Sequence, residues 1–168
     1  MIDFKNIVLT TDLSSNSEVA APYAIELAQR FGATVQLVHV FEGSLYWENY
    51  AAAEGIMFDT SGWITSIRAS RQTSLATLAA SLSMTGKVQV IPVLLEGAAA
   101  AEILKFAKDK NVDCIVIATH GRTGFSHFLF GSVAERVVRL SPCPVLSIRP
   151  QNIEPAKQEM SASVAAAR

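Results

Sequence analysis

Residues 114–138, "CIVIATHGRTGFSHFLFGSVAERVV", join an apolar run, a glycine-containing loop and an amphipathic segment. The run 114–118 is short and apolar, which predicts a strand buried on both faces, as in parallel sheets. After the loop, Val133, Val137 and Leu140 recur at helical spacing, and Pro142 ends the helix. A buried strand followed by a helix is the repeating unit of an α/β fold.

The rest of the chain repeats this alternation. Apolar runs at 7–9, 34–41, 88–95 and 145–148 predict four further strands, with helices expected between them at 63–84 and around Ile103, Leu104 and Ala107. Pro92 favours an edge position for its strand, and Asn111 can cap the preceding helix. We predict an open, doubly wound, five-stranded parallel sheet with helices on both faces, Rossmann-like in class.

The first helix has a capping signal and a regular apolar pattern. Ser15 and Glu18 have the spacing of a capping box, and Gly32 is suited to close the helix. Pro22 lies inside the predicted helix and is expected to bend it. The expected buried face consists of residues four apart: Val19, Tyr23, Leu27 and Phe31.

Two segments do not follow the α/β alternation. Residues 42–62 show no clear period, and a connection of this length in a compact domain is often functional or mobile. The aromatic residues of this segment could cover a pocket, contact a partner or pack on one another: Tyr46, Trp47, Tyr50 and Phe58. From 150 onward no apolar face is evident, so we expect one domain over 1–150 and a loose tail over 151–168.

Composition excludes several classes of protein. The 168 residues carry a net charge of −1, which argues against binding nucleic acid or a membrane surface mainly by electrostatics. No signal-peptide pattern and no apolar run of membrane-spanning length is present. Cys114 and Cys143 lack C-x-x-C spacing, so neither a zinc site nor a disulfide framework is indicated, and Cys143 is expected to be a small packed residue. We expect a reduced, cytoplasmic protein.

Polar residues follow two of the predicted strands. Thr10, Thr11 and Asp12 end the first strand, and 118–121 (Ala-Thr-His-Gly) ends the fourth. In an open doubly wound sheet, ligands bind at the carboxyl ends of the strands where the strand order reverses. If the order is 3-2-1-4-5, both clusters meet at that crevice.

The glycine loop favours an anionic ligand. Gly121 and Gly124 let backbone N–H groups approach a ligand closely, and Gly131-Ser132 opens a helix whose first N–H groups point toward negative charge. Ser132 adds a hydroxyl, and Arg122 adds a bidentate cation. A phosphate would be held there without a catalytic lysine.

A purely structural interpretation remains open beside this one. Gly121 and Gly124 could shape a turn, Gly131-Ser132 could cap a helix, and Asp12 could cap the first helix instead of accepting a hydrogen bond from a ribose or a base. His120 could position a phosphate or be an exposed loop residue, and His39 is expected to be a core-edge residue.

Common catalytic and nucleotide motifs are absent. The chain contains no G-x-x-x-x-G-K-[ST], no G-x-G-x-x-G and no G-x-S-x-G. The histidines at 39, 120 and 127 do not have metal-ligand spacing. We therefore exclude a P-loop NTPase, a dinucleotide fingerprint and a nucleophile elbow.

The segments IVLTTDLS (7–14) and HGRTG…GSVAERVV…PCPVL (120–146) resemble the universal stress protein family, and the resemblance runs from Lys5 to about Arg149. The resemblance includes the G-x-x-G-x9-G-[ST] pattern of the family's nucleotide-binding branch. In this chain Gly121 is followed by nine residues and then by Gly131-Ser132. Ala118 replaces the first glycine of that pattern, and Thr10 stands where some relatives have proline. If position 118 required a positive φ, alanine would cost about 1 kcal/mol or more.

The resemblance implies sheet order 3-2-1-4-5 and a homodimer paired through the last strand, Val145 to Ile148. It implies ATP (or ADP or AMP) as the cofactor, with Asp12 and the backbone of Val40 facing the adenine and ribose. Mg²⁺ is expected with ATP because triphosphates habitually carry a divalent ion. The triphosphate would lie on five residues: Gly121, Arg122, Gly131, Ser132 and Val133.

Three functions follow from these patterns. The first is a nucleotide-binding protein of stress response or signalling, acting through its dimer or an unknown protein partner, and at most a slow ATPase with Asp12 and Glu42 as the nearest candidate bases. The second is a dimeric, stress-linked interaction module that binds no nucleotide. The third, a dedicated enzyme of the wider nucleotide-binding group, lacks its signatures S-G-G-x-D-S and H-I-G-H.

Overall fold

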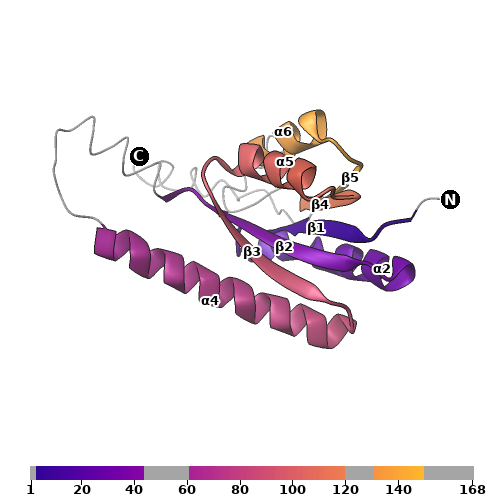
Figure 1. Cartoon of the computed structure of the whole chain (residues 1–168), viewed down its shortest axis with the longest axis horizontal. Helices are drawn as coiled ribbons and strands as arrows, with labels where there is room; N and C mark the ends of the chain where they lie inside the picture. The colour runs from indigo at the N-terminus through magenta and orange to yellow at the C-terminus, as the bar shows by residue number, and fades with distance from the viewer. Residues whose placement is uncertain (1–2, 44–60, 120–130, 150–168) are drawn as a thin grey trace, which may run out of the picture.

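The computed structural model describes residues 3–43, 61–119 and 131–149, which form a five-stranded sheet with helices on both faces (Figure 1). The sheet order is β3-β2-β1-β4-β5 and every neighbouring pair is parallel, so the predicted fold class and strand order are confirmed. The strands are β1 (Asn6–Thr10), β2 (Thr34–Phe41), β3 (Val90–Glu96), β4 (Cys114–Ala118) and β5 (Val145–Ile148).

The helices divide between the two faces of this sheet. On one face lie α1 (Ser15–Glu18), α2 (Ala21–Phe31) and α4 (Ser61–Gly86), and on the other lie α5 (Ala99–Asp109) and α6 (Ser132–Leu140) (Figure 1). Each face has its own apolar core, one around Leu9, Leu37 and Leu75 and the other around Val38 and Ile115. The central strands are therefore buried on both sides, as their continuous apolar runs indicate.

The prediction for the first helix was wrong in two respects. The N-cap is Ser14, whose side chain accepts a hydrogen bond from the Ser17 N–H, so the capping box at Ser15 is not formed. The helix does not bend at Pro22. Instead α1 ends after Glu18 and a second helix starts at Ala21, placing Pro22 in its first turn, where a missing N–H costs no hydrogen bond.

The predicted buried face is wrong at Tyr23, whereas Val19, Leu27 and Phe31 are half-buried and pack against the core as predicted. Tyr23 is 47% exposed, whereas Ala21, Ala24 and Ala28 are buried. Small alanine side chains let the helix axis approach the sheet closely, which a tyrosine on that face would prevent. The predicted end of the helix is confirmed, since Gly32 is its C-cap, in a left-handed conformation with φ 64°.

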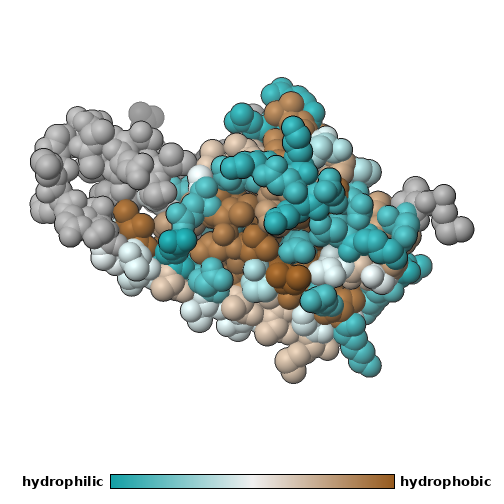
Figure 2. All heavy atoms as spheres, viewed as in Figure 1, coloured by the Kyte–Doolittle hydropathy of each residue, from teal (hydrophilic) through white to brown (hydrophobic). Residues whose placement is uncertain are grey.

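The remaining described elements follow the sequence pattern. Pro92 lies in edge strand β3, and the helix expected at 63–84 extends over Ser61–Gly86. Apolar side chains gather over the middle of the face shown in Figure 2. The edge-strand residues Val93 and Leu95 are only half-buried. The aromatic residues at 46, 47, 50 and 58 and the expected tail 151–168 lie outside the described residues. In the described part of the chain, no helix combines the length and hydropathy needed to cross a bilayer.

Candidate nucleotide site

The end of β1 is recessed between two neighbouring strands that extend past it. Thr10 is the last residue of β1 and pairs with Val38, while β2 continues to Phe41 and β4 continues to Ala118, past its last pairing with β1 at Val116. After Thr10 the chain turns away into α1. This arrangement leaves a notch at the carboxyl edge of the sheet, at the point where the strand order reverses.

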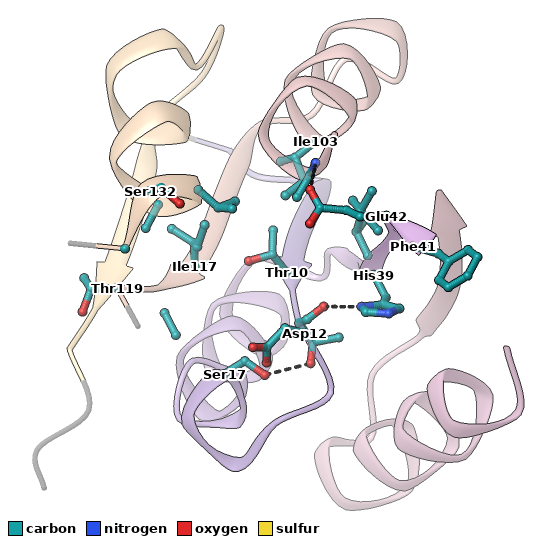
Figure 3. A pocket seen from close by; sticks show the side chains of 18 of the residues that line it. Thr10, Asp12, Ser17, His39, Phe41, Glu42, Ile103, Ile117, Thr119 and Ser132 are labelled. Atoms are coloured by element: carbon teal, nitrogen blue, oxygen red, sulfur yellow. Dashed lines mark hydrogen bonds between the residues drawn. The ribbon is translucent and has the colours of Figure 1, made fainter. Parts of the chain in front are cut away.

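The notch is a cavity of about 480 Å³, a size typical of small-molecule sites. Its walls come from the ends of β1, β2 and β4 and from the starts of α5 and α6, as Figure 3 shows. The lining residues are Thr10, Thr11, Asp12, Ser17, Val38, His39, Val40, Phe41, Glu42, Gly43, Arg71, Ala99, Ile103, Ile117, Ala118, Thr119, Gly131, Ser132, Val133 and Ala134.

Helix α6 begins at this cavity without a side-chain cap. Gly131 is its N-cap residue, and its own N–H donates to the Thr119 carbonyl at 2.7 Å. A Cβ at Gly131 would lie 3.2 Å from that same oxygen, so the close approach of the two segments favours glycine. The N–H groups of the first helical turn, at Ser132 and Val133, have no intrahelical acceptor and can donate hydrogen bonds to a ligand at this edge of the cavity.

Asp12 organises the turn that follows β1. Its Oδ1 accepts a hydrogen bond from the Ser14 N–H at 3.0 Å and another from the Ser14 hydroxyl. Asp12 therefore does not cap α1 itself but holds the residue that does, because Ser14 carries the cap. Thr11 supports the same turn, since its Oγ1 accepts from the Leu13 N–H at 2.9 Å and lies 3.0 Å from the Ser17 hydroxyl.

His39 is part of the cavity wall as well as a buried residue at the end of β2. Its side chain is 7% exposed, and its Nδ1 lies 2.9 Å from the Thr11 carbonyl oxygen. Since a carbonyl oxygen only accepts, the Nδ1 carries the proton in this contact. The ring thus ties the turn after β1 to β2, as Figure 3 shows. The interpretation of His39 as a core-edge residue was incomplete.

The sequence patterns assigned none of the wall residues on α4 and α5 to the site, and they indicated Glu42 only as a candidate base. Arg71 comes from α4, Ile103 and Ala99 come from α5, and Glu42 follows β2. No local sequence pattern marks the helical residues as part of a site, because only the packing of their helices against the sheet brings them to the cavity. Glu42 could be assigned to the site from the sequence, because it directly follows the end of a central strand.

The structure brings eight of the twelve predicted site residues to this one cavity: Thr10, Thr11, Asp12, Val40, Ala118, Gly131, Ser132 and Val133. The other four, His120, Gly121, Arg122 and Gly124, lie outside the described residues. Ala118 is buried in the extended backbone of β4 and is not among the residues with positive φ. A glycine is therefore not required there by the backbone.

The described residues do not include a group of three or more histidine, cysteine or acidic side chains suited to hold a metal ion. Cys114 and Cys143 are free cysteines. Cys143 is half-buried and packs against the apolar core around Val38 and Ile115. Burial raises the pKa of the Cys114 thiol from 9.0 to about 11, and the neighbouring Cys143 adds to the shift. Cys114 is therefore a protonated core residue at neutral pH.

Comparison with known proteins agrees with this architecture. The model of the universal stress protein family matches residues 3–149. The chain belongs to the universal stress protein family. Among curated relatives, the universal stress protein MJ0531 of Methanocaldococcus jannaschii is 35% identical over 148 residues, covering 87% of this chain and 82% of the relative.

Solved structures share the fold over most of their length. Protein MJ0577, solved to assign a biochemical function, is 26% identical with a TM-score of 0.74, covering 89% of this chain and 98% of its own. A universal stress protein in complex with cAMP has a TM-score of 0.65 at 19% identity (88% and 98% covered). The Archaeoglobus fulgidus universal stress protein in complex with dAMP has a TM-score of 0.59 at 24% identity (88% and 99% covered).

Proposed function

We propose that this universal stress protein binds ATP in the cavity at the end of β1. The observation that carries the proposal is the uncapped start of α6 on the same cavity as the turn at Asp12. One end of the cavity thus offers backbone donors to phosphate, and the other offers carboxylate and backbone groups to a nucleoside. Family members of this fold in complex with cAMP and dAMP support an adenine nucleotide as the ligand.

In this proposal Gly131, Ser132 and Val133 contact the phosphates, together with Gly121 and Arg122. Asp12 and the backbone of Val40 contact the adenine and ribose. Mg²⁺ arrives bound to the phosphates of ATP, which themselves supply oxygen ligands of the kind that Mg²⁺ prefers.

The biological role we propose is regulatory, in stress response or signalling in the cytoplasm. Nucleotide occupancy would change the state of a homodimer, paired through β5, or its affinity for a protein partner. β5 is an edge strand of the described sheet, and pairing with a second copy would remove that edge.

Thermal unfolding with and without saturating Mg-ATP tests the proposal. A ligand at a hundred times its Kd adds about 2.7 kcal/mol to the free energy of unfolding. For a chain of 168 residues we expect the Tm to rise by roughly 5 to 10 °C.

Gly131→Val is the matched variant, because its side chain would occupy the space between α6 and the Thr119 carbonyl. Its Tm should not respond to Mg-ATP, and circular dichroism should show that it remains folded. If millimolar Mg-ATP leaves the wild-type Tm unchanged and the purified protein carries no nucleotide, the nucleotide-free interaction module is the better account.

A further inference from the structure

The turn between β3 and α5 is tied to Phe41, the last residue of β2, and to Glu42, the residue after it. Phe41 pairs with Glu96 in the sheet, and its carbonyl accepts a hydrogen bond from the Gly97 N–H at 3.2 Å. The next residue, Glu42, accepts a hydrogen bond from the Ala99 N–H through its Oε1, at 2.8 Å. Glu42 is thereby held by its own carboxylate and, through the preceding residue Phe41, by the pairing of β2 with β3.

This contact gives α5 a cap from another element. The N-cap residue of α5, Ala98, makes no side-chain cap hydrogen bond. The Glu42 carboxylate lies instead at the first N–H of the helix, where the helix dipole stabilises a negative charge. The charge of Glu42 is therefore fixed in place at the cavity wall.

The same carboxylate faces the cavity. Glu42 is a lining residue, and Figure 3 shows its carboxylate between Ile103 and Thr10, away from Ser132 at the start of α6. A carboxylate has two oxygens and about four lone-pair sites, and an ionised one only accepts hydrogen bonds. The bond to Ala99 uses one site and leaves acceptor capacity toward the cavity.

These contacts restrict what Glu42 can bind. A negative carboxylate repels phosphate, so a nucleotide with its phosphates at α6 places its uncharged half toward Glu42. That half carries O–H and N–H donors, the ribose hydroxyls and the amino group of adenine. Glu42 itself is exposed, so a nucleoside donor would replace water at its carboxylate, in a cavity that the apolar side chains Ile103 and Ile117 help to line.

We propose that Glu42 is a specificity-determining residue of the nucleotide site, accepting a hydrogen bond from a neutral donor on the nucleoside while capping α5. The inference rests on the proposed nucleotide function. Glu42 selects for a ligand with a donor at that point, and against a bare polyphosphate.

Glu42→Gln separates this role from that of a helix cap. The glutamine oxygen still accepts from the Ala99 N–H, so the Tm without ligand should stay close to that of the wild type. The second atom becomes an NH₂ donor, so ATP affinity measured by calorimetry should fall roughly tenfold or more. Glu102→Gln is the matched control: it removes the same charge from the first turn of α5 at a residue that does not line the cavity, and should bind ATP as the wild type does.

Nucleotide analogues identify the donor. The wild type and Glu42→Gln are titrated with ATP, 2′-deoxyATP, 3′-deoxyATP and purine riboside triphosphate, which lacks the 6-amino group. The analogue that lacks the donor should bind the wild type more weakly than ATP does. Its affinity for Glu42→Gln should be little lower than for the wild type, because the two changes remove the same interaction. Glu42→Asp, which withdraws the carboxylate by one methylene, should show the same pattern.

The inference is overturned if Glu42→Gln binds ATP as tightly as the wild type, or if all analogues lose equal affinity in the variant. A wild type without affinity for any of the four nucleotides would overturn the proposed function itself. That result differs from one in which the wild type and Glu42→Gln bind ATP equally well, which would overturn only the role of Glu42.

Discussion

Ala118 stands at the position of the first glycine in the pattern that the sequence resembles. The replacement introduces no backbone strain, because Ala118 is in the extended conformation of β4. Its methyl group forms part of the cavity wall and is 8% exposed. The methyl group can therefore affect a ligand only by occupying space in the cavity.

Ala118→Gly should bind ATP at least as tightly as the wild type, since removing the methyl group widens the cavity beside the start of α6. The same change should lower the free energy of unfolding by about 0.5 to 1 kcal/mol, the cost of glycine in a strand. Calorimetric titration with Mg-ATP and urea unfolding measure the two effects. Weaker binding by Ala118→Gly would show that the methyl group contacts the nucleotide favourably.

At the scale of the element, the sequence predicts strands better than helix starts. β2, β4 and β5 were predicted with their observed bounds, because an apolar run between turn residues has few alternative structures. The first helix was mispredicted because Ser14, Ser15 and Ser17 all offer capping hydroxyls, and only the hydrogen bonds of Asp12 select Ser14.

The candidate site shows the same division. The residues at the ends of β1 and β4 were predictable, because strand order alone brings them to one edge of the sheet. The contributions of Arg71 and Ile103 depend on how α4 and α5 pack, which no short sequence pattern specifies. The role of His39 depends on a turn at Thr11 that brings a carbonyl to its ring.

The end of α2 provides a clean test of a local prediction. Gly32 has φ 64°, and an added Cβ would meet no atom within 4 Å. Gly32→Ala should therefore lose stability through the backbone alone, by about 1 to 2 kcal/mol. For this chain length that is a fall in Tm of roughly 2 to 8 °C by differential scanning calorimetry.

Gly62→Ala is the control for Gly32→Ala. Gly62 lies in the first turn of α4, its added Cβ also meets nothing within 4 Å, and its φ is not positive. Alanine should leave the Tm unchanged or raise it, since it stabilises a helix relative to glycine by up to about 1 kcal/mol. Equal losses from both substitutions would contradict the assignment of the cost at Gly32 to its conformation.

At the scale of the whole molecule, the proposed homodimer depends on the free side of β5. The Ile115 and Thr119 N–H groups donate to the carbonyls of Pro144 and Ile148, so these β5 carbonyls face β4. Because backbone groups alternate along a strand, those of Val145 and Ser147 face away from β4. A second copy would pair with these outward groups.

Ser147→Pro should therefore convert a dimer into a monomer without unfolding the chain. Proline removes the outward N–H of residue 147 and is tolerated on the free side of an edge strand, while the hydrogen bonds to β4 remain. Ser147→Ala keeps the N–H and should remain dimeric. Light scattering coupled to size-exclusion chromatography should give twice the 18.1 kDa chain mass for the wild type and Ser147→Ala, and the single chain mass for Ser147→Pro. A folded Ser147→Pro that stays dimeric would place the interface elsewhere, and a monomeric wild type would remove the dimer from the proposed mechanism.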